Sequence, residues 1–159
     1  MQKYEIEKTT CEYVTENIFK TISDVNTPQG ILAIIGRKAT EAEIDYTQDI
    51  IVALDDIQDP GNLGTILRTV DSVGLTQLIV SKGTADIYNP KVVRSSMGAI
   101  FRVEVIEVEN LKETIEMIRR NSYKLLVTSL QTDNSVYDID YNKKVIVIGN
   151  EANGVSKEV

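Results

Sequence analysis

The sequence predicts an α/β fold in which a parallel sheet carries helices on both faces. After residue 49, short apolar runs alternate with stretches whose apolar residues recur every three or four positions, the pattern of strands alternating with helices. Glycine or proline stands at several of the junctions. Because such βαβ units form parallel sheets that bind ligands at the carboxyl ends of their strands, we expect the functional site at that edge.

The first 49 residues carry a weaker pattern. Alternating apolar residues near the N-terminus predict a strand, and Val14, Ile18 and Ile22 then recur at helical spacing. A linker is expected at 26–30. The apolar run 31–35 predicts a short strand, while the polar stretch that follows it predicts an exposed connection. We expect a domain boundary between residues 28 and 49.

From residue 50 onward, the same two patterns define each element in turn. Apolar runs predict strands at 50–54, 77–81, 102–108, 124–129 and 145–149. Helical periodicity predicts helices at 63–73, 90–98 and 111–121, and the second of these begins at a proline. Gly74 and Gly98 stand where helix C-caps are expected.

Composition limits the classes of function. The 159 residues are 42% hydrophobic, which is enough for one α/β domain with a core. The formal net charge of −7 argues against a general affinity for the nucleic-acid backbone. Two alternatives remain for the basic residues of the region after Asn62: they form a local basic face, or they are scattered and solvated. The candidate residues of such a face are Lys82, Lys91, Arg94 and Arg102.

Histidine is absent and Cys11 is the only cysteine. These two facts exclude the usual catalytic triads, a disulfide framework within the chain and a cysteine-rich zinc site, so we expect no metal. The N-terminus lacks the pattern of a secretory signal, and the apolar runs are far shorter than the roughly 20 residues that cross a bilayer. We therefore expect a cytoplasmic location and no membrane partner.

The most informative segment is the turn after the apolar run 50–54. A Pro-Gly pair precedes Asn62, and Arg68 follows within the predicted helix. The start of a helix favours anions and polarised oxygens, and Arg68 would add a permanent cation there. Asn62 could orient a substrate hydroxyl, or it could simply be the N-cap of the helix.

The second informative segment is the apolar run 145–149 and the polar residues after it. Glu151 would stand at the carboxyl end of a strand, although acids in such positions are often only solvated. Thr128 and Ser129 close the preceding strand and would lie on the same edge. The chain lacks both the Gly-x-Gly-x-x-Gly and the Gly-x-x-x-x-Gly-Lys signatures, which disfavours a nucleotide-dependent enzyme such as a dehydrogenase.

Two segments together resemble motifs of the SpoU/TrmH family of RNA ribose 2′-O-methyltransferases. They are Asp-Pro-Gly-Asn-Leu-Gly through Arg68 and Ile-Gly-Asn-Glu-Ala-Asn-Gly-Val at 148–155, and they occur in the family's order. The intervening Asn-Pro-Lys-Val-Val-Arg-Ser-Ser-Met-Gly-Ala at 89–99 also looks like the family's middle region. The resemblance covers residue 50 to the end of the chain.

The resemblance implies a SPOUT-type domain with a deep trefoil knot, S-adenosylmethionine as methyl donor, and a homodimer whose two subunits share each active site. By position, it assigns Asn62, Arg68 and Glu151 to the catalytic site. It assigns the donor site to two strand ends, whose residues are Thr128, Ser129, Leu130, Ile148, Gly149 and Asn150.

The family's third motif, a Ser-Leu-Asn segment that helps to form the donor pocket and the knot, is missing before Val159. We therefore expect a chain truncated at both ends, with the completeness of the knot left open. Residues 1–30 would be the remnant or linker of an N-terminal RNA-binding domain, and residues 31–159 the methyltransferase domain.

The expected function is S-adenosylmethionine-dependent methylation of a ribose 2′-hydroxyl in rRNA or tRNA. Arg68 would either receive the hydroxyl proton with help from an RNA phosphate or stabilise the developing alkoxide. A non-catalytic, RNA-associated module of the same fold is the alternative. A purely structural role, with the helix at 111–121 as a dimer surface, is a third.

Overall fold

The computed structural model describes residues 11–36, 42–129 and 131–159. Contacts divide the chain into two units, Met1–Lys38 and Ala39–Val159. Each unit is described by itself.

The first unit contains one described helix, α1 (Glu16–Ile22), which confirms the helix predicted from Val14, Ile18 and Ile22. None of its residues is buried. The strand predicted at 31–35 is wrong, since these residues form no regular element. A strand needs a hydrogen-bonded neighbour, and the described part of this unit offers none. The strand predicted near the N-terminus falls largely outside the described residues.

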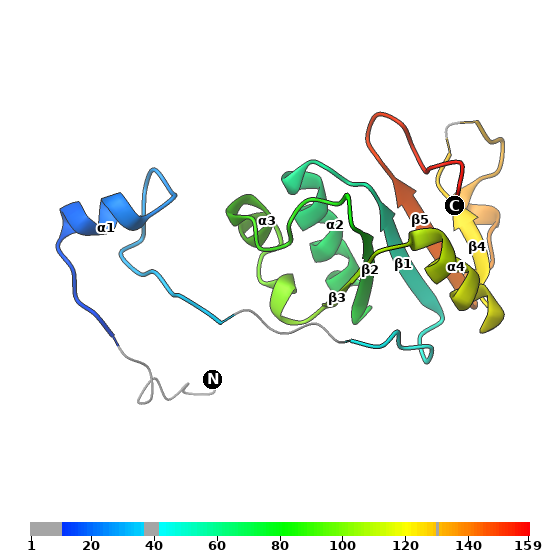
Figure 1. The fold of residues 1–159 in the computed structure, drawn as a ribbon, viewed down its shortest axis with the longest axis horizontal. Coiled ribbons are helices and arrows are strands. Elements are labelled where there is room, and N and C mark those ends of the chain that lie inside the picture. Colours follow the sequence, from blue (N-terminus) through cyan, green and yellow to red (C-terminus); the bar gives the residue numbers. More distant parts are fainter. Residues whose placement is uncertain (1–10, 37–41, 130) are drawn as a thin grey trace. The chain divides into compact units, whose positions relative to one another are not determined.

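The second unit is built on a five-stranded parallel sheet in the order β3-β2-β1-β5-β4 (Figure 1). The strands are β1 (Ile50–Asp55), β2 (Gln77–Ser81), β3 (Glu104–Val108), β4 (Lys124–Val127) and β5 (Lys144–Gly149). β1 and β5 pair along their whole length, with Asp55 opposite Gly149. The two strands therefore end together, and the chain leaves both at the same edge of the sheet.

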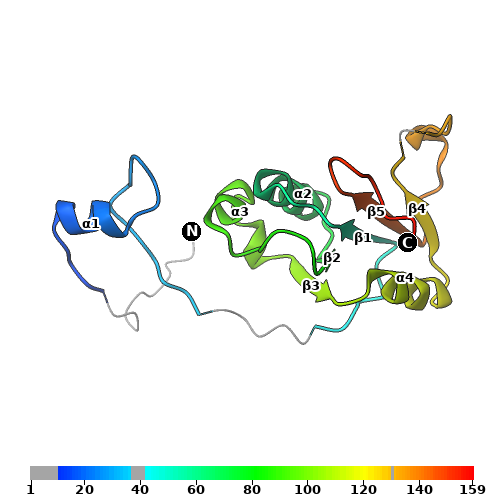
Figure 2. The same ribbon diagram turned by 45° about the horizontal axis from the view of Figure 1, so that its top comes forward.

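Helices cover both faces of this sheet, as predicted. They are α2 (Pro60–Ser72), α3 (Pro90–Ser95) and α4 (Leu111–Arg120), with short 3-10 helices η2 (Ala99–Phe101) and η3 (Val136–Asp138). α2 and α3 lie on one face and α4 on the other (Figure 2). Side chains alternate along β1, so Val52 and Leu54 pack under α2 while Ile51 and Ala53 pack under α4.

The boundaries of α2 differ from the prediction. The helix begins at Pro60, three residues earlier than expected, because proline is well suited to the first helical position and needs no N–H partner there. Asp59 is the N-cap, and its side chain accepts a hydrogen bond from the backbone N–H of Asn62. The alternative that Asn62 caps the helix is therefore wrong, and its side chain is free for another role.

The other helix ends follow the sequence more closely. Gly74 has φ +79° directly after the C-cap of α2, as expected. α3 ends at Ser95 rather than at 98, and Gly98, with φ +84°, begins the turn into η2. Within the described residues, no helix is long and apolar enough to cross a membrane.

Candidate functional site at the carboxyl ends of β1 and β5

The loop between β1 and α2 and the loop after β5 meet through Glu151. Its Oε1 accepts hydrogen bonds from Asn62 Nδ2 (3.0 Å) and from the backbone N–H of Asp59 (3.3 Å). Its Oε2 accepts one from the backbone N–H of Gln58 (3.3 Å). One carboxylate from the second motif thus holds both the backbone and the asparagine side chain of the first.

These donors determine the charge of Glu151. The hydrogen bond from Asn62, together with the backbone N–H groups, lowers the pKa of the Glu151 carboxyl from its ordinary value. The group is therefore ionised at neutral pH, and both of its oxygens accept hydrogen bonds. In this structure the carboxylate fixes the amide of Asn62.

Asp59 is a second carboxylate at the start of α2. Its Oδ1 accepts from the backbone N–H of Asn62 (2.9 Å), and its Oδ2 accepts from Lys91 Nζ (3.2 Å). The backbone N–H of Asn62 is the main cause that lowers the pKa of Asp59, and Lys91 adds to it. Asn62 is consequently held at its backbone by Asp59 and at its side chain by Glu151.

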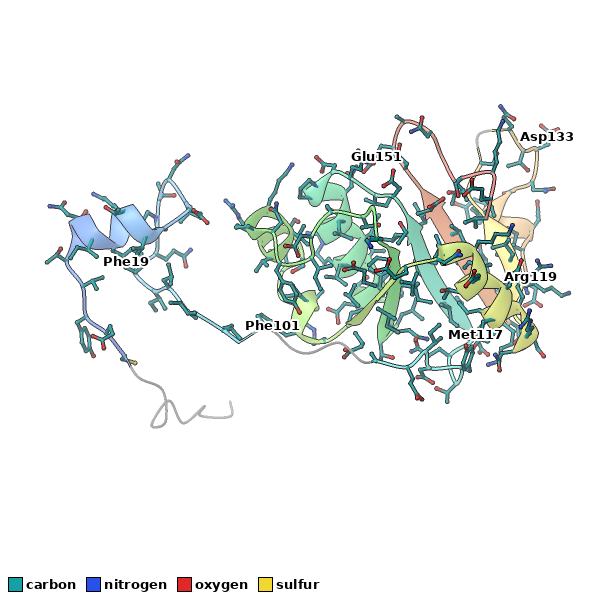
Figure 3. The ribbon with its side chains drawn as sticks, in the orientation of Figure 1. Phe19, Phe101, Met117, Arg119, Asp133 and Glu151 are labelled. Carbon is teal, nitrogen blue, oxygen red and sulfur yellow. The ribbon has the colours of Figure 1, made fainter. Side chains whose placement is uncertain are left out.

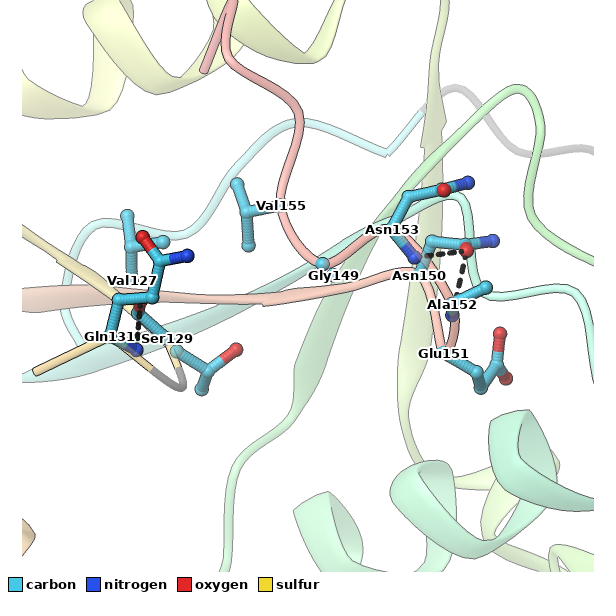
Figure 4. Close-up of a pocket in the computed structure, with 11 residues that line it drawn as sticks. Val127, Ser129, Gln131, Gly149, Asn150, Glu151, Ala152, Asn153 and Val155 are labelled. Atoms are coloured by element: carbon cyan, nitrogen blue, oxygen red, sulfur yellow. Dashed lines mark hydrogen bonds between the residues drawn. The ribbon is translucent and has the colours of Figure 1, made fainter.

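Asn150 fixes the loop after β5 from within. Its Oδ1 accepts from the backbone N–H groups of Ala152 and Asn153, both at 3.0 Å (Figure 4). Its Nδ2 donates to the backbone carbonyl of Asp56 at 2.8 Å. Asp56, which has φ +60°, is also held by Ser81 Oγ, which accepts its backbone N–H at 2.8 Å. The ends of β1, β2 and β5 are therefore tied together beside the Asn62–Glu151 pair.

A pocket of about 570 Å³ opens at the ends of β4 and β5 (Figure 4). It is lined by Val127, Thr128, Ser129, Gln131 and the run 149–155. At Gly149 the chain folds back so closely that a Cβ would collide with the backbone of Gly154 and Val155. Only glycine fits there, and the absence of a side chain lets the loop form this wall of the pocket.

A comparison with protein families decides the relationship of the chain to known proteins. The model of the SpoU rRNA Methylase family matches residues 49–159, which is the whole second unit apart from its first ten residues. This chain belongs to the SpoU rRNA methylase family.

Individual relatives agree with the SpoU assignment. The 23S rRNA (guanosine(2553)-2′-O)-methyltransferase RlmP of Bacillus subtilis is 32% identical over 146 residues, which cover 91% of this chain and 57% of that protein. The SpoU methyltransferase AviRb of Streptomyces viridochromogenes, solved in complex with AdoMet, is 35% identical with a TM-score of 0.65, over 72% of this chain and 46% of AviRb.

An AdoMet-bound rRNA methyltransferase from Sinorhizobium meliloti is 34% identical with a TM-score of 0.64, over 69% of this chain and 42% of that one. The chain thus spans about half the length of these relatives. The predicted family and the predicted SPOUT-type parallel α/β fold are confirmed. Whether the chain forms a knot stays a prediction.

The predicted donor-site residues of this SpoU domain divide into three groups. Thr128, Ser129, Gly149 and Asn150 line the pocket. Ile148 does not line it, because its partly buried side chain packs against the core under α2. Leu130 lies outside the described residues.

The predicted catalytic residues are only partly brought together. Asn62 and Glu151 are in contact, but Arg68 lies six residues further along α2, which corresponds to about 9 Å of helix rise. Its side chain is exposed, and no described residue is its hydrogen-bond or ion-pair partner. Arg68 lies more than two turns from the start of α2, and not close to it as expected, because α2 begins three residues earlier than predicted. The six-residue spacing sets its distance from Asn62, and its place in the catalytic site stays a prediction.

Several residues of the candidate site were not found from the sequence. Gln58 and Asp59 contribute through backbone N–H groups, which leave no trace in residue type. Asp55, which is buried at the end of β1, accepts the backbone N–H of Ser156 at 2.7 Å. A buried aspartate at the end of an apolar strand is a signal that could have been used. No group of three candidate ligands for a metal ion occurs among the described residues.

Proposed function

We propose that this chain belongs to an enzyme that uses S-adenosylmethionine to methylate a ribose 2′-hydroxyl in rRNA or tRNA. The observation that carries the proposal is the hydrogen bond between Asn62 and Glu151, which are 89 residues apart and come from the two family motifs. It lies beside a pocket built by the second motif. The names of the relatives support the same chemistry, since RlmP is a 2′-O-methyltransferase of 23S rRNA.

The pocket fits the methyl donor. Its volume falls within the roughly 300–1,000 Å³ of small-molecule sites. Backbone and small polar side chains line it, and Gly149 allows the backbone of Gly154 and Val155 to approach closely in its wall. Thr128, Ser129, Gly149 and Asn150 would hold the donor, with Leu130 and Ile148 adjoining them in the chain. When bound, the donor supplies an electrophilic methyl group on a sulfonium.

The residues of the first motif would act on the acceptor. The amide of Asn62, fixed by Glu151 and Asp59, is suited to orient the ribose hydroxyl by a hydrogen bond. Arg68 carries a permanent positive charge that would stabilise the developing alkoxide or bind the adjoining phosphate. Glu151 would act as a positioning residue, since its oxygens are already occupied.

A homodimer is part of the proposal. Arg68 lies about two turns from Asn62 on the same helix, so one copy does not gather all the catalytic residues in contact. A second copy that contributes residues to this edge would complete the site. We also propose that residues 31–159 form the methyltransferase domain and that residues 1–30 belong to, or link to, an RNA-binding part.

Methyl transfer to RNA tests the proposal. The chain is incubated with labelled S-adenosylmethionine and unmodified rRNA or tRNA, and resistance of the labelled position to alkaline hydrolysis identifies 2′-O-methylation. We expect transfer by the wild type, and loss of at least tenfold in Arg68→Lys, because lysine lacks the planar, forked donors of arginine. Arg119→Lys on α4 is the matched control and should retain activity.

Each outcome bears on the proposal. Binding of the donor without any transfer to either RNA would favour the non-catalytic module. Normal turnover by Arg68→Lys would remove Arg68 from the mechanism.

A further inference from the structure

The charges of this chain are unevenly distributed along its fold. Between Pro60 and Val103, which include α2, β2 and α3, there are five Lys and Arg against two Asp and no Glu. The whole chain has 17 basic against 24 acidic residues. The next segment, 104–118, has five Glu against one Lys. The α2–α3 region is therefore basic within an acidic chain, and β3 with most of α4 is strongly acidic.

Ion pairs neutralise some of these cations and leave others exposed. Lys82 pairs with Glu109 at 2.8 Å, Arg102 pairs with Asp71 at 2.7 Å, and Lys91 pairs with Asp59 at 3.2 Å. The shared basic face stays a prediction, and three of its four candidate residues are paired with acids. Arg94 is exposed, and its guanidinium has no hydrogen-bond or ion-pair partner among the described residues, as is also true of Arg68.

Arg68, Arg94 and the Asp59-paired Lys91 lie on neighbouring helices. Lys91 and Arg94 are three residues apart on α3 and therefore lie on one side of it. On α2, a Cβ at Gly61 would contact Lys91, and one at Gly64 would collide with Ser95 of α3. Arg68 follows Gly64 by four residues, so it lies on the side of α2 that faces α3.

This basic strip begins at the candidate site. Lys91 Nζ is 3.2 Å from Oδ2 of Asp59, the residue that caps α2 and holds the backbone of Asn62. Arg94 lies about one helical turn further along α3, and Arg68 lies about one turn beyond Gly64, where α2 approaches Ser95 of α3. A phosphate backbone that follows Lys91, Arg94 and Arg68 would pass directly beside Asn62.

We propose that the strip formed by Lys91, Arg94 and Arg68 on α2 and α3 binds the phosphates of single-stranded RNA that flank the target ribose. The inference rests on the proposed function, which supplies RNA as the substrate. It adds the path that the RNA follows over α2 and α3. Phosphates are attracted to this strip and repelled by the five glutamates of 104–118. RNA is favoured over an anionic membrane because the strip leads to Asn62, a group suited to a ribose hydroxyl.

The test compares two matched arginine variants. Arg94→Gln removes a cation from the strip, while Arg119→Gln removes an exposed cation from α4, on the other face of the sheet (Figure 3). Binding of a short fluorescein-labelled single-stranded RNA is measured by anisotropy between about 50 and 200 mM salt. Binding of S-adenosylhomocysteine is measured for the same proteins, since neither arginine lines the pocket.

We expect Arg94→Gln to weaken RNA binding several-fold at low salt and to reduce the slope of log K against log salt by about 0.7, the value for one lost phosphate contact on a single strand. Arg119→Gln should leave both quantities unchanged. An equal effect of the two substitutions, no effect of either, or tighter binding to anionic vesicles than to RNA would overturn the inference.

The same measurements separate this inference from the proposed function. If S-adenosylhomocysteine binds and methyl transfer occurs while Arg94→Gln binds RNA normally, the strip does not bind RNA and the enzyme assignment stands. If RNA binding depends on Arg94 but S-adenosylhomocysteine does not bind, the strip stands and the donor site is wrong.

Discussion

The hydrogen bond between Asn62 and Glu151 can be tested by a double-mutant cycle that needs no activity assay. The variants are Asn62→Ala, Glu151→Ala and the pair of substitutions together. The first removes one donor to the carboxylate, while the second removes the acceptor for three donors. If the two motifs are physically joined as the structure shows, the free energies of unfolding of the two single variants will not add.

The size of the effect follows from the geometry. Hydrogen bonds to a charged group contribute about 1.5–3 kcal/mol in sheltered sites, but Glu151 is exposed and two of its three bonds are 3.3 Å long. Solvent screening reduces the contribution, so we expect Glu151→Ala to cost about 1–2 kcal/mol. The Asn62–Glu151 bond accounts for part of it, with an expected coupling free energy of about 0.5–1 kcal/mol.

The assay is urea unfolding followed by far-ultraviolet circular dichroism, with equal m-values required for all variants so that midpoints can be compared. Glu116→Ala, which removes an exposed glutamate from α4, is the control and should change the free energy of unfolding by less than about 0.5 kcal/mol. Additivity of the Asn62 and Glu151 substitutions within about 0.3 kcal/mol would refute the contact.

Two further predictions concern packing and pH. Gly64→Ala should destabilise the chain by about 1–3 kcal/mol in urea unfolding, because its Cβ would collide with Ser95 where α2 crosses α3. Gly36→Ala is the control, because a Cβ at that position would have no atom within 4 Å. Equal losses of stability in the two variants would contradict the close contact between α2 and α3. The lowered pKa of Glu151 means that its stabilisation is complete above the ordinary glutamate value of 4.5 and is lost as the pH falls through the lower, folded-state pKa. The unfolding temperature of the wild type should therefore fall faster than that of Glu151→Gln as the pH drops below 4.5. Equal falls in the two unfolding temperatures would exclude this role for the carboxylate.

Much of the fold could be predicted because buried parallel strands and amphipathic helices have distinct periodicities. The five strands of the sheet were all found from apolar runs, with ends within two residues of those observed. The run 31–35 failed because the same pattern cannot show whether a neighbouring strand exists. The start of α2 was misplaced because Pro60 and Gly61 were interpreted as a turn, whereas Asp59 caps a helix that includes both.

The site was predictable to a smaller extent. Sheet topology and the family resemblance together indicated that Asn62 and Glu151 would lie at one edge, and they are in contact. The backbone N–H groups of Gln58 and Asp59 that complete the acceptor set of Glu151 depend on the conformation of a loop, which residue types do not encode. Arg68 was expected near the start of α2. Because the helix begins three residues earlier than predicted, Arg68 lies most of a turn further from that start.

The central claim is that the edge formed by 128–129 and 149–155 binds the methyl donor. Calorimetric titration of S-adenosylhomocysteine into the chain tests it most directly, with Gly149→Ala and Gly74→Ala compared with wild type. A Cβ at 149 would displace the pocket wall, whereas position 74 lies at the far end of α2 with nothing within 4 Å. We predict that wild type and Gly74→Ala each bind S-adenosylhomocysteine at one site per chain. Gly149→Ala, once circular dichroism shows that it is folded, should bind at least tenfold more weakly. Absence of binding by the wild type, or unchanged binding by folded Gly149→Ala, would contradict the account.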